Sequence, residues 1–140
     1  RARDLGFEVI DTSKEDVVDA VLSRTDGRGA SVTFDAAGVP FSCGVIIDVT
    51  GIKGRIVMVA IHKKRCEILF QQLSYREQTI LGTRVYAAGD FATAIVLAAS
   101  GAVDPQAIVA HTFPMKDAVH AFEIARDAHT SCKVLIEQPS

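Results

Sequence analysis

The stretch GRIVMVAI at Gly54–Ile61 is the strongest strand pattern in the chain. Its apolar residues run without a break from Ile56 to Ile61, which is typical of a strand covered on both faces in a parallel sheet. Helix and strand patterns alternate on both sides of this stretch, so it predicts a central strand of an α/β sheet.

Upstream of the central strand, five further elements are expected. A helix ends at Gly6, a strand follows at Phe7–Ile10, a helix begins after the overlapping capping boxes of Thr12–Asp16, a strand ends near Asp35, and a helix covers Phe41–Val49.

Downstream, the same alternation continues to the end of the chain. The expected elements are a strand at Ile80–Tyr86, a helix at Phe91–Ser100 capped by Asp90, a strand near Ala110–Phe113, a helix at Lys116–Ala128 and a strand at Cys132–Glu137. Thr83 and Arg84 make the first of these strands polar in part, which suits a sheet edge or a partner-facing strand. The whole pattern predicts a doubly wound α/β architecture.

Composition narrows the class of protein. The 140 residues are 49% hydrophobic, enough to bury one core. Fifteen Lys+Arg against 17 Asp+Glu leave a net charge of −2, too balanced for nucleic-acid binding. No run of about 18 apolar residues exists, so no membrane span is expected. The absence of an initial Met and of an apolar leader leads us to expect a processed or truncated cytoplasmic product.

The three cysteines, Cys43, Cys66 and Cys132, are far apart in the sequence. An odd number at such spacings fits neither a disulfide framework nor the paired C-x2-4-C ligands of a zinc knuckle. Reduced, buried thiols in a cytosolic protein are favoured over a redox role.

Two strand ends are candidate ligand-binding edges. Small residues follow one strand at Asp35–Val39, and Ala60-Ile61-His62 ends the central strand. Ligands of doubly wound sheets bind beyond the carboxyl ends of the strands, where small residues allow a flat ligand to approach the backbone. The same residues would equally ease packing between strand and helix, and both interpretations stay open.

Most catalytic motifs are absent. Gly27–Val32 begins like G-x-G-x-x-G, but it lacks the third glycine and precedes a strand, so it is not a phosphate loop. No P-loop, H-E-x-x-H or G-x-S-x-G motif occurs. His62 ends the central strand, although a direct catalytic role for it is not favoured, and His120 and His129 are expected on the surface.

Several short motifs in order resemble one known family. They are Asp35-Ala-Ala-Gly38, Gly54–Ala60, Ile80-Leu-Gly-Thr83, Tyr86–Phe91, Ser100–Asp104, His111–Pro114, Ala121-Phe122 and Lys133–Ile136. Together they resemble the C-terminal part of a zinc-type medium-chain alcohol dehydrogenase, nearest the butanediol, sorbitol and threonine dehydrogenase branch. The resemblance covers essentially the whole chain.

The resemblance implies a partial Rossmann-like doubly wound parallel sheet that lacks its first strands and carries a C-terminal helix-strand extension. It places a partial dinucleotide-binding domain at residues 1–88, and at residues 89–140 a C-terminal segment that returns to an absent catalytic domain. The family's glycine-rich loop, ribose-binding acid, zinc ligands and proton relay would all lie upstream of Arg1. We therefore expect no catalytic residue and no zinc ligand in this chain, and zinc only in the intact parent.

The resemblance also implies an NAD or NADP site. Ala37, Gly38 and Val39 would border the adenine or ribose, and Val59, Ala60 and Ile61 would line the nicotinamide pocket. Thr83 and Val85 would meet the carboxamide through backbone groups, and Lys133 would approach the pyrophosphate or act as a solvated strand-end charge. The family commonly has glycine where this chain has Ala60.

Function follows from the resemblance in two forms. The first is a fragment of an enzyme that transfers a hydride between an alcohol or polyol and NAD(P), inactive as the isolated chain. The second is a non-catalytic module that forms a homodimer by pairing Ile80–Tyr86 across a two-fold axis. An unrelated doubly wound binding protein is a third, fold-level alternative.

Overall fold

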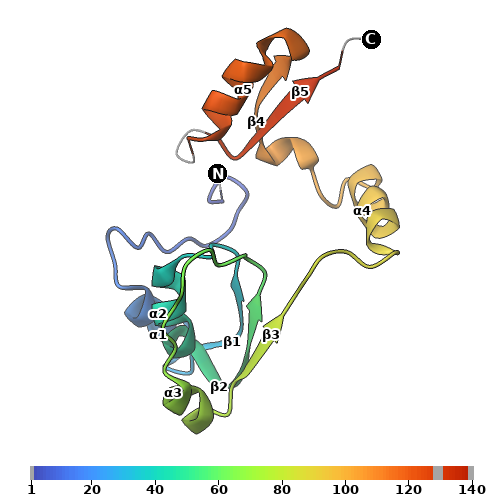
Figure 1. The fold of residues 1–140 in the computed structure, drawn as a ribbon. Helices are drawn as coiled ribbons and strands as arrows, with labels where there is room; N and C mark the ends of the chain where they lie inside the picture. Colours follow the sequence, from blue (N-terminus) through green and yellow to red (C-terminus); the bar gives the residue numbers. More distant parts are fainter. Residues whose placement is uncertain (1, 128–130, 139–140) are drawn as a thin grey trace. The chain divides into compact units, whose positions relative to one another are not determined.

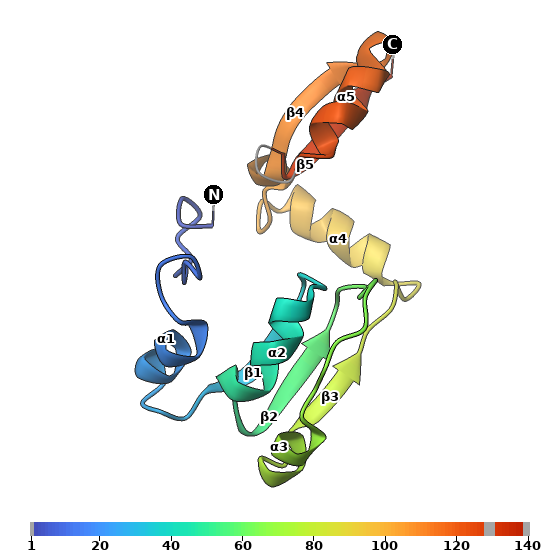
Figure 2. The ribbon, with the colours of Figure 1, turned by 60° about the vertical axis from the view of Figure 1, so that its left-hand side comes forward.

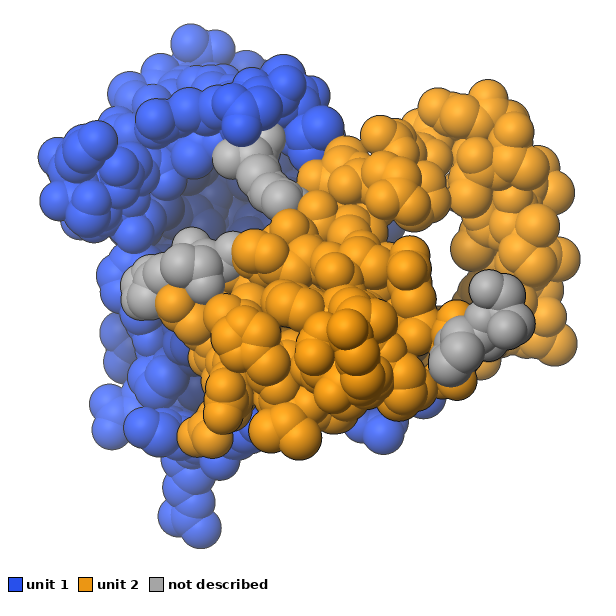
Figure 3. All heavy atoms as spheres, turned by 90° about the horizontal axis from the view of Figure 1, so that it is seen from above, with its two compact units in different colours: residues 1–85 blue, residues 86–140 orange. Residues whose placement is uncertain are grey.

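A computed structural model describes residues 2–127 and 131–138 of the chain. The chain divides into two compact units, residues 1–85 and 86–140, which Figure 3 shows in different colours. Each unit is described separately below. The predicted domain boundary after residue 88 stays a prediction.

Unit 1 is built on a three-stranded parallel sheet (Figure 1). Its strands are β1 (Ala30–Asp35), β2 (Thr50–Met58) and β3 (Thr79–Gly82), in the order β1-β2-β3. Helix α2 (Pro40–Val49) connects β1 to β2, and α3 (Phe70–Tyr75) lies in the connection from β2 to β3. The parallel α/β architecture and the helix at 41–49 are confirmed, whereas α3 was not predicted.

The core lies on one face of this sheet. Two crossovers that step in the same direction across a sheet place their helices on the same face, because such crossovers are right-handed. Ile46 and Ile47 of α2 therefore meet the fully buried Ile56 of β2, and Leu73 of α3 packs against the same cluster. Figure 2 shows α2 lying across the strands.

The opposite face of the sheet is open within unit 1. Phe34, Val57 and Leu81 stand in register across the three strands, and Phe34 is 66% exposed. The prediction of a central strand covered on both faces is therefore wrong for this unit, because both crossover helices pack on the same side.

The N-terminal segment also differs from the prediction. Helix α1 (Val17–Arg24) begins after Asp16, whose carboxylate accepts hydrogen bonds from the N–H groups of Val18 and Asp19. Asp16 therefore caps the helix in place of Thr12 or Ser13. Residues 2–6 form turns rather than a helix, and Phe7–Ile10 pairs with no described strand.

Two strands end earlier than predicted. β2 ends at Met58, so Val59, Ala60 and Ile61 follow the strand. β3 ends at Gly82, and beyond it the N–H and the hydroxyl of Thr83 both donate hydrogen bonds to the Met58 carbonyl of β2. The residues predicted to bind a cofactor thus lie in the loops after the strands.

Unit 2 contains a long exposed helix and a two-stranded parallel sheet. Helix α4 (Asp90–Ala99) has no buried residue, and Asp90 is its first residue rather than its cap. β4 (Val109–Pro114) pairs with β5 (Lys133–Glu137), and α5 (Ala118–Ala125) packs on this pair through the buried Ala121. Two short 3-10 helices, Pro105–Ile108 and Met115–Asp117, precede β4 and α5 respectively. Helix α5 therefore begins at Ala118, two residues after the predicted start at Lys116.

Helix α5 ends at Ala125, three residues before the predicted end, because Arg126 is its C-cap and Asp127 is not helical. Ala128 and His129 themselves lie outside the described residues. Among the helices that are described, none has both the length and the apolar character needed to cross a membrane.

Candidate functional site: the carboxyl edge of the sheet in unit 1

Asp35 organises the carboxyl edge of the three-stranded sheet. It is the last residue of β1, and its side chain is completely buried. Its Oδ1 accepts hydrogen bonds from the N–H groups of Ala37 at 2.9 Å and Gly38 at 3.0 Å. Its backbone carbonyl accepts two more, from the N–H groups of Val59 and Ala60 after β2. Asp35 therefore ties together the two loops that form this edge.

The second carboxylate oxygen of Asp35 has side-chain donors. The Ser42 hydroxyl donates to Oδ2 at 3.0 Å, and His62 Nε2 lies 2.7 Å from the same atom. Burial pushes the pKa of Asp35 upward, but the hydrogen bonds from Gly38, Ala37, Ser42 and His62 together hold this pKa below its usual value of 3.8. Asp35 is thus an anion at neutral pH.

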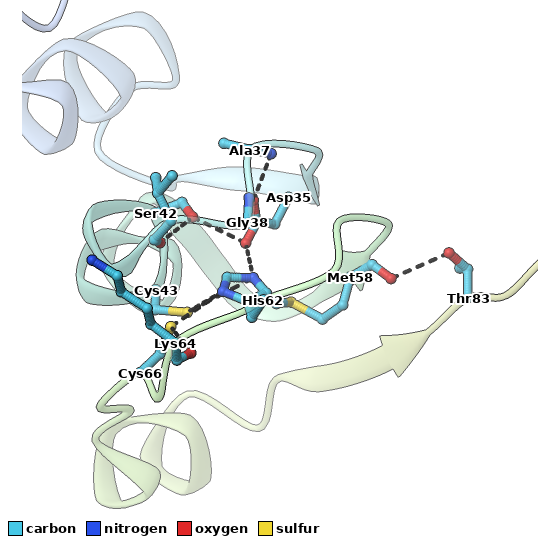
Figure 4. A network of polar contacts seen from close by, with 11 residues as sticks. Asp35, Ala37, Gly38, Ser42, Cys43, Met58, His62, Lys64, Cys66 and Thr83 are labelled. Carbon is cyan, nitrogen blue, oxygen red and sulfur yellow. Dashed lines mark hydrogen bonds and ion pairs between the residues drawn. The ribbon is translucent and has the colours of Figure 1, made fainter. Parts of the chain in front are cut away.

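His62 lies between this anion and two thiols (Figure 4). Because an ionised carboxylate only accepts hydrogen bonds, Nε2 of His62 carries a hydrogen and donates it to Asp35. In the neutral ring, Nδ1 then holds a free lone pair. This atom lies 3.1 Å from Sγ of Cys66 and 3.5 Å from Sγ of Cys43.

All three cysteines are free thiols, but only Cys43 is buried; Cys66 is half-buried and Cys132 exposed. The prediction of buried thiols is therefore wrong for Cys132, which precedes β5 at the surface. Burial, followed by the hydrogen bond and charge of Cys66 and the charge of Asp35, raises the pKa of Cys43 to about 11. Cys43 is protonated at neutral pH.

Gly38 is required by packing at this edge. Its φ is +66°, and a Cβ placed there would lie 3.0 Å from Cβ of Ala60 and 3.1 Å from the Ile61 carbonyl oxygen. This contact holds the loop after β1 against the loop after β2. The packing interpretation, left open by the sequence, thus applies to Gly38.

The other predicted cofactor residues of unit 1 lie in the loops that follow β1, β2 and β3. Val39 precedes α2 at its N-cap position and is 44% exposed. Val59, Ile61 and Val85 are exposed apolar side chains in the loops after β2 and β3. Ala37 and Val39 also line an apolar hollow of about 250 Å³ beside β1.

Two more residues, Thr83 and Lys133, are predicted to contact the cofactor. The N–H and the hydroxyl of Thr83 both donate to the Met58 carbonyl, each at 3.2 Å, so its N–H is already used within the sheet. Lys133 is the first residue of β5 in unit 2 and is exposed. Its approach to a pyrophosphate stays a prediction.

The sequence did not reveal the Asp35–His62–Cys43–Cys66 cluster. One signal was available for Asp35, because an aspartate followed by small residues at a strand end is typical of a side chain that bonds the next backbone N–H groups. Cys43, His62 and Cys66 come from α2 and from the loop after β2, and no fixed spacing marks them as neighbours.

The sequence of the chain is similar to those of known dehydrogenases. The family model described as zinc-binding dehydrogenase matches residues 1–100. The chain is 35% identical over 136 residues to 2-dehydro-3-deoxy-L-galactonate 5-dehydrogenase of Pseudoalteromonas atlantica, covering 97% of this chain and 40% of that protein. It is 31% identical to L-arabinitol 4-dehydrogenase of Hypocrea jecorina, covering 91% of this chain and 34% of that protein.

Solved structures show the same fold. The crystal structure of 2R,3R-butanediol dehydrogenase from Bacillus subtilis matches 99% of this chain and 40% of its own, with a TM-score of 0.88 and 29% identity. An Escherichia coli oxidoreductase/dehydrogenase of unknown specificity matches 99% of this chain, and 40% of its own, with a TM-score of 0.92 and 26% identity. The chain thus spans well under half the length of its relatives, and over that span both its sequence and its Rossmann-like fold make it a member of the zinc-binding dehydrogenase family.

Proposed function

We propose that this chain supplies the cofactor-binding part of an enzyme that transfers a hydride between an alcohol or polyol and NAD(P). One observation supports this most strongly: the carboxyl edge of the β1-β2-β3 sheet presents the exposed apolar side chains of Val39, Val59 and Ile61. Ligands of such sheets bind at this edge, and apolar side chains there suit a flat aromatic ring. Membership of the family and the polyol dehydrogenases among its relatives supply the reaction class.

The residues of the chain then have distinct roles. Val59, Ala60 and Ile61 pack against the nicotinamide, while Ala37 and Val39 border the adenine side beside the apolar hollow. Thr83 offers its backbone carbonyl to the carboxamide, since its N–H is bonded to Met58, and Val85 lies beyond it. Gly38 acts through packing, and Lys133 is the candidate pyrophosphate ligand of unit 2.

When bound, NAD(P) exchanges a hydride at its nicotinamide ring, and the family's zinc polarises the alcohol oxygen. The resemblance places the ligands of that zinc outside this chain. The chain's own residues hold the cofactor ring flat against the sheet edge and exclude water from it.

The test compares two proteins in an assay for NAD(P)H formation. The longest natural chain that contains these residues should reduce NAD or NADP when it is offered a panel of polyols, vicinal diols and sugar acids. The isolated 140 residues should show no turnover with the same substrates and added zinc. Turnover by the isolated chain, or its absence from the longer protein on the whole panel, would contradict the proposal.

A homodimer is part of the same proposal. Among the described strands β3 pairs only with β2, which leaves its other edge to pair with a second copy across a two-fold axis. Ile80, Leu81 and Gly82 belong to this edge, whereas Thr83–Tyr86 follow the strand. A cytoplasmic location stays a prediction.

A further inference from the structure

The geometry points to a metal site formed by Cys43, His62 and Cys66, which would bind a thiophilic divalent cation such as Zn²⁺. One ligand atom from each residue lies within 4.8 Å of the other two. This inference concerns residues that the proposed hydride transfer does not use.

The distances suit tetrahedral coordination. With Zn–S of about 2.3 Å and Zn–N of about 2.0–2.1 Å, neighbouring ligand atoms of a tetrahedral site lie about 3.5–3.8 Å apart. Nδ1 of His62 lies 3.5 Å from Sγ of Cys43 and 3.1 Å from Sγ of Cys66. Sγ of Cys43 also lies 4.0 Å from Nε2, beside the ring, so coordination requires the Cys43 and Cys66 side chains to turn toward the lone pair of Nδ1.

Asp35 prepares His62 for this role. Metal-bound histidines almost always donate their second ring N–H to a carboxylate or carbonyl, which orients the ring and strengthens the ligand. Nε2 of His62 lies 2.7 Å from the buried Oδ2 of Asp35, and that carboxylate is itself held by Ser42 and two backbone N–H groups. Nδ1, the ring nitrogen nearer to both thiols, is therefore left without a hydrogen in the neutral ring before any cation binds (Figure 4).

The charges of the site balance. A divalent cation replaces the S–H protons of Cys43 and Cys66, which pass to solvent, so the cation and two thiolates are neutral together. The remaining negative charge of Asp35 is accompanied by the exposed run Lys63-Lys64-Arg65 between His62 and Cys66. Three protein ligands leave the fourth position to water or to a small exogenous ligand.

Cobalt provides the direct test, because Co²⁺ bound by thiolates gives a charge-transfer absorption that Co²⁺ in water lacks. When one equivalent of Co²⁺ is added to the reduced, metal-free chain, this absorption should be stronger in the wild type than in its Cys66→Ser variant. Added Zn²⁺ should then remove the absorption. Cys132→Ser is the matched control, because Cys132 lies in unit 2 outside the cluster. It should bind as the wild type does.

Second variants test the geometry. Asp35→Asn should weaken Co²⁺ binding by about 10–100-fold, as changes to a carboxylate behind a histidine ligand do. Substitution His62→Gln should abolish the absorption while circular dichroism shows an unchanged fold. Three results would overturn the proposal: no thiolate absorption in the wild type, an equal response in Cys66→Ser, or a Cys43–Cys66 disulfide whose reduction restores no metal binding.

Discussion

Gly38→Ala tests how the carboxyl edge is assembled. An L-residue in the left-handed conformation costs about 1–2 kcal/mol, and Gly38 has φ +66°. The new Cβ would also lie 3.0 Å from Cβ of Ala60, inside the optimum of about 3.5–4.0 Å for two carbons. Because the backbone carbonyl of Ile61 blocks the other side at 3.1 Å, relaxation is limited. Together these terms lower the free energy of unfolding by about 2 kcal/mol.

The control is Gly44→Ala. Gly44 lies in the middle of α2 and is exposed to solvent, and an added Cβ there meets nothing within 4 Å. Alanine there should raise the free energy of unfolding by about 0.8–1 kcal/mol, since it is the better helix former. With a urea slope of about 2 kcal/mol per molar, the two midpoints should differ by roughly 1.5 M. Circular dichroism measures the midpoints, and amide exchange in β2 assigns them to unit 1. A Gly38→Ala protein as stable as Gly44→Ala would refute the reasoning.

Three further outcomes are expected. Gln78→Leu should lower the free energy of unfolding by about 1–3 kcal/mol, because the buried amide of Gln78 donates to the backbone carbonyls of residues 47, 50 and 51. Urea titration measures this change, and the same substitution at the exposed Gln71 should leave the free energy of unfolding nearly unchanged. The pKa of Asp35 is lowered below 3.8, so its stabilisation is present above that pH and is lost as the pH falls through the folded value. The urea midpoints of the wild type and Asp35→Asn should therefore converge in acid, and a constant difference would argue against an ionised Asp35. Leu81→Lys should convert a dimer into a monomer in sedimentation velocity, because charge on an edge strand opposes pairing; an unchanged dimer would exclude this edge.

The sequence predicts the elements whose pattern is local. The apolar run after Gly54 is a strand as far as Met58, and the segment Phe41–Val49 is a helix; Ile46, Ile47 and Ile56 of these two elements form the core. Helix α3 was missed because it has only six residues and no cap hydrogen bond from a side chain. The strand expected at Phe7–Ile10 has no described partner, and a strand pattern alone does not create a ladder.

Part of the candidate site is also visible in the sequence, and part of it is formed only by the tertiary structure. Small and apolar residues at strand ends are visible in the sequence, so a cofactor edge at Ala37, Val59 and Ile61 could be proposed from the sequence once the family resemblance was recognised. The cluster of Asp35, His62 and two cysteines could not, because its members meet only when the loops after β1 and β2 are brought together by the sheet. That juxtaposition is a tertiary property.

The central claim is that NAD(P) lies over the carboxyl edge of the sheet in unit 1. The most direct measurement is the Kd for NADH of the longest natural chain and of two variants, Val59→Asp at this edge and Ile52→Asp near the start of β2. Both side chains are apolar and exposed, by 50% and 72%. A carboxylate beside the cofactor should raise the Kd at least about tenfold for Val59→Asp, equivalent to about 1.4 kcal/mol, and leave it unchanged for Ile52→Asp. Equal values for the two variants would contradict the account.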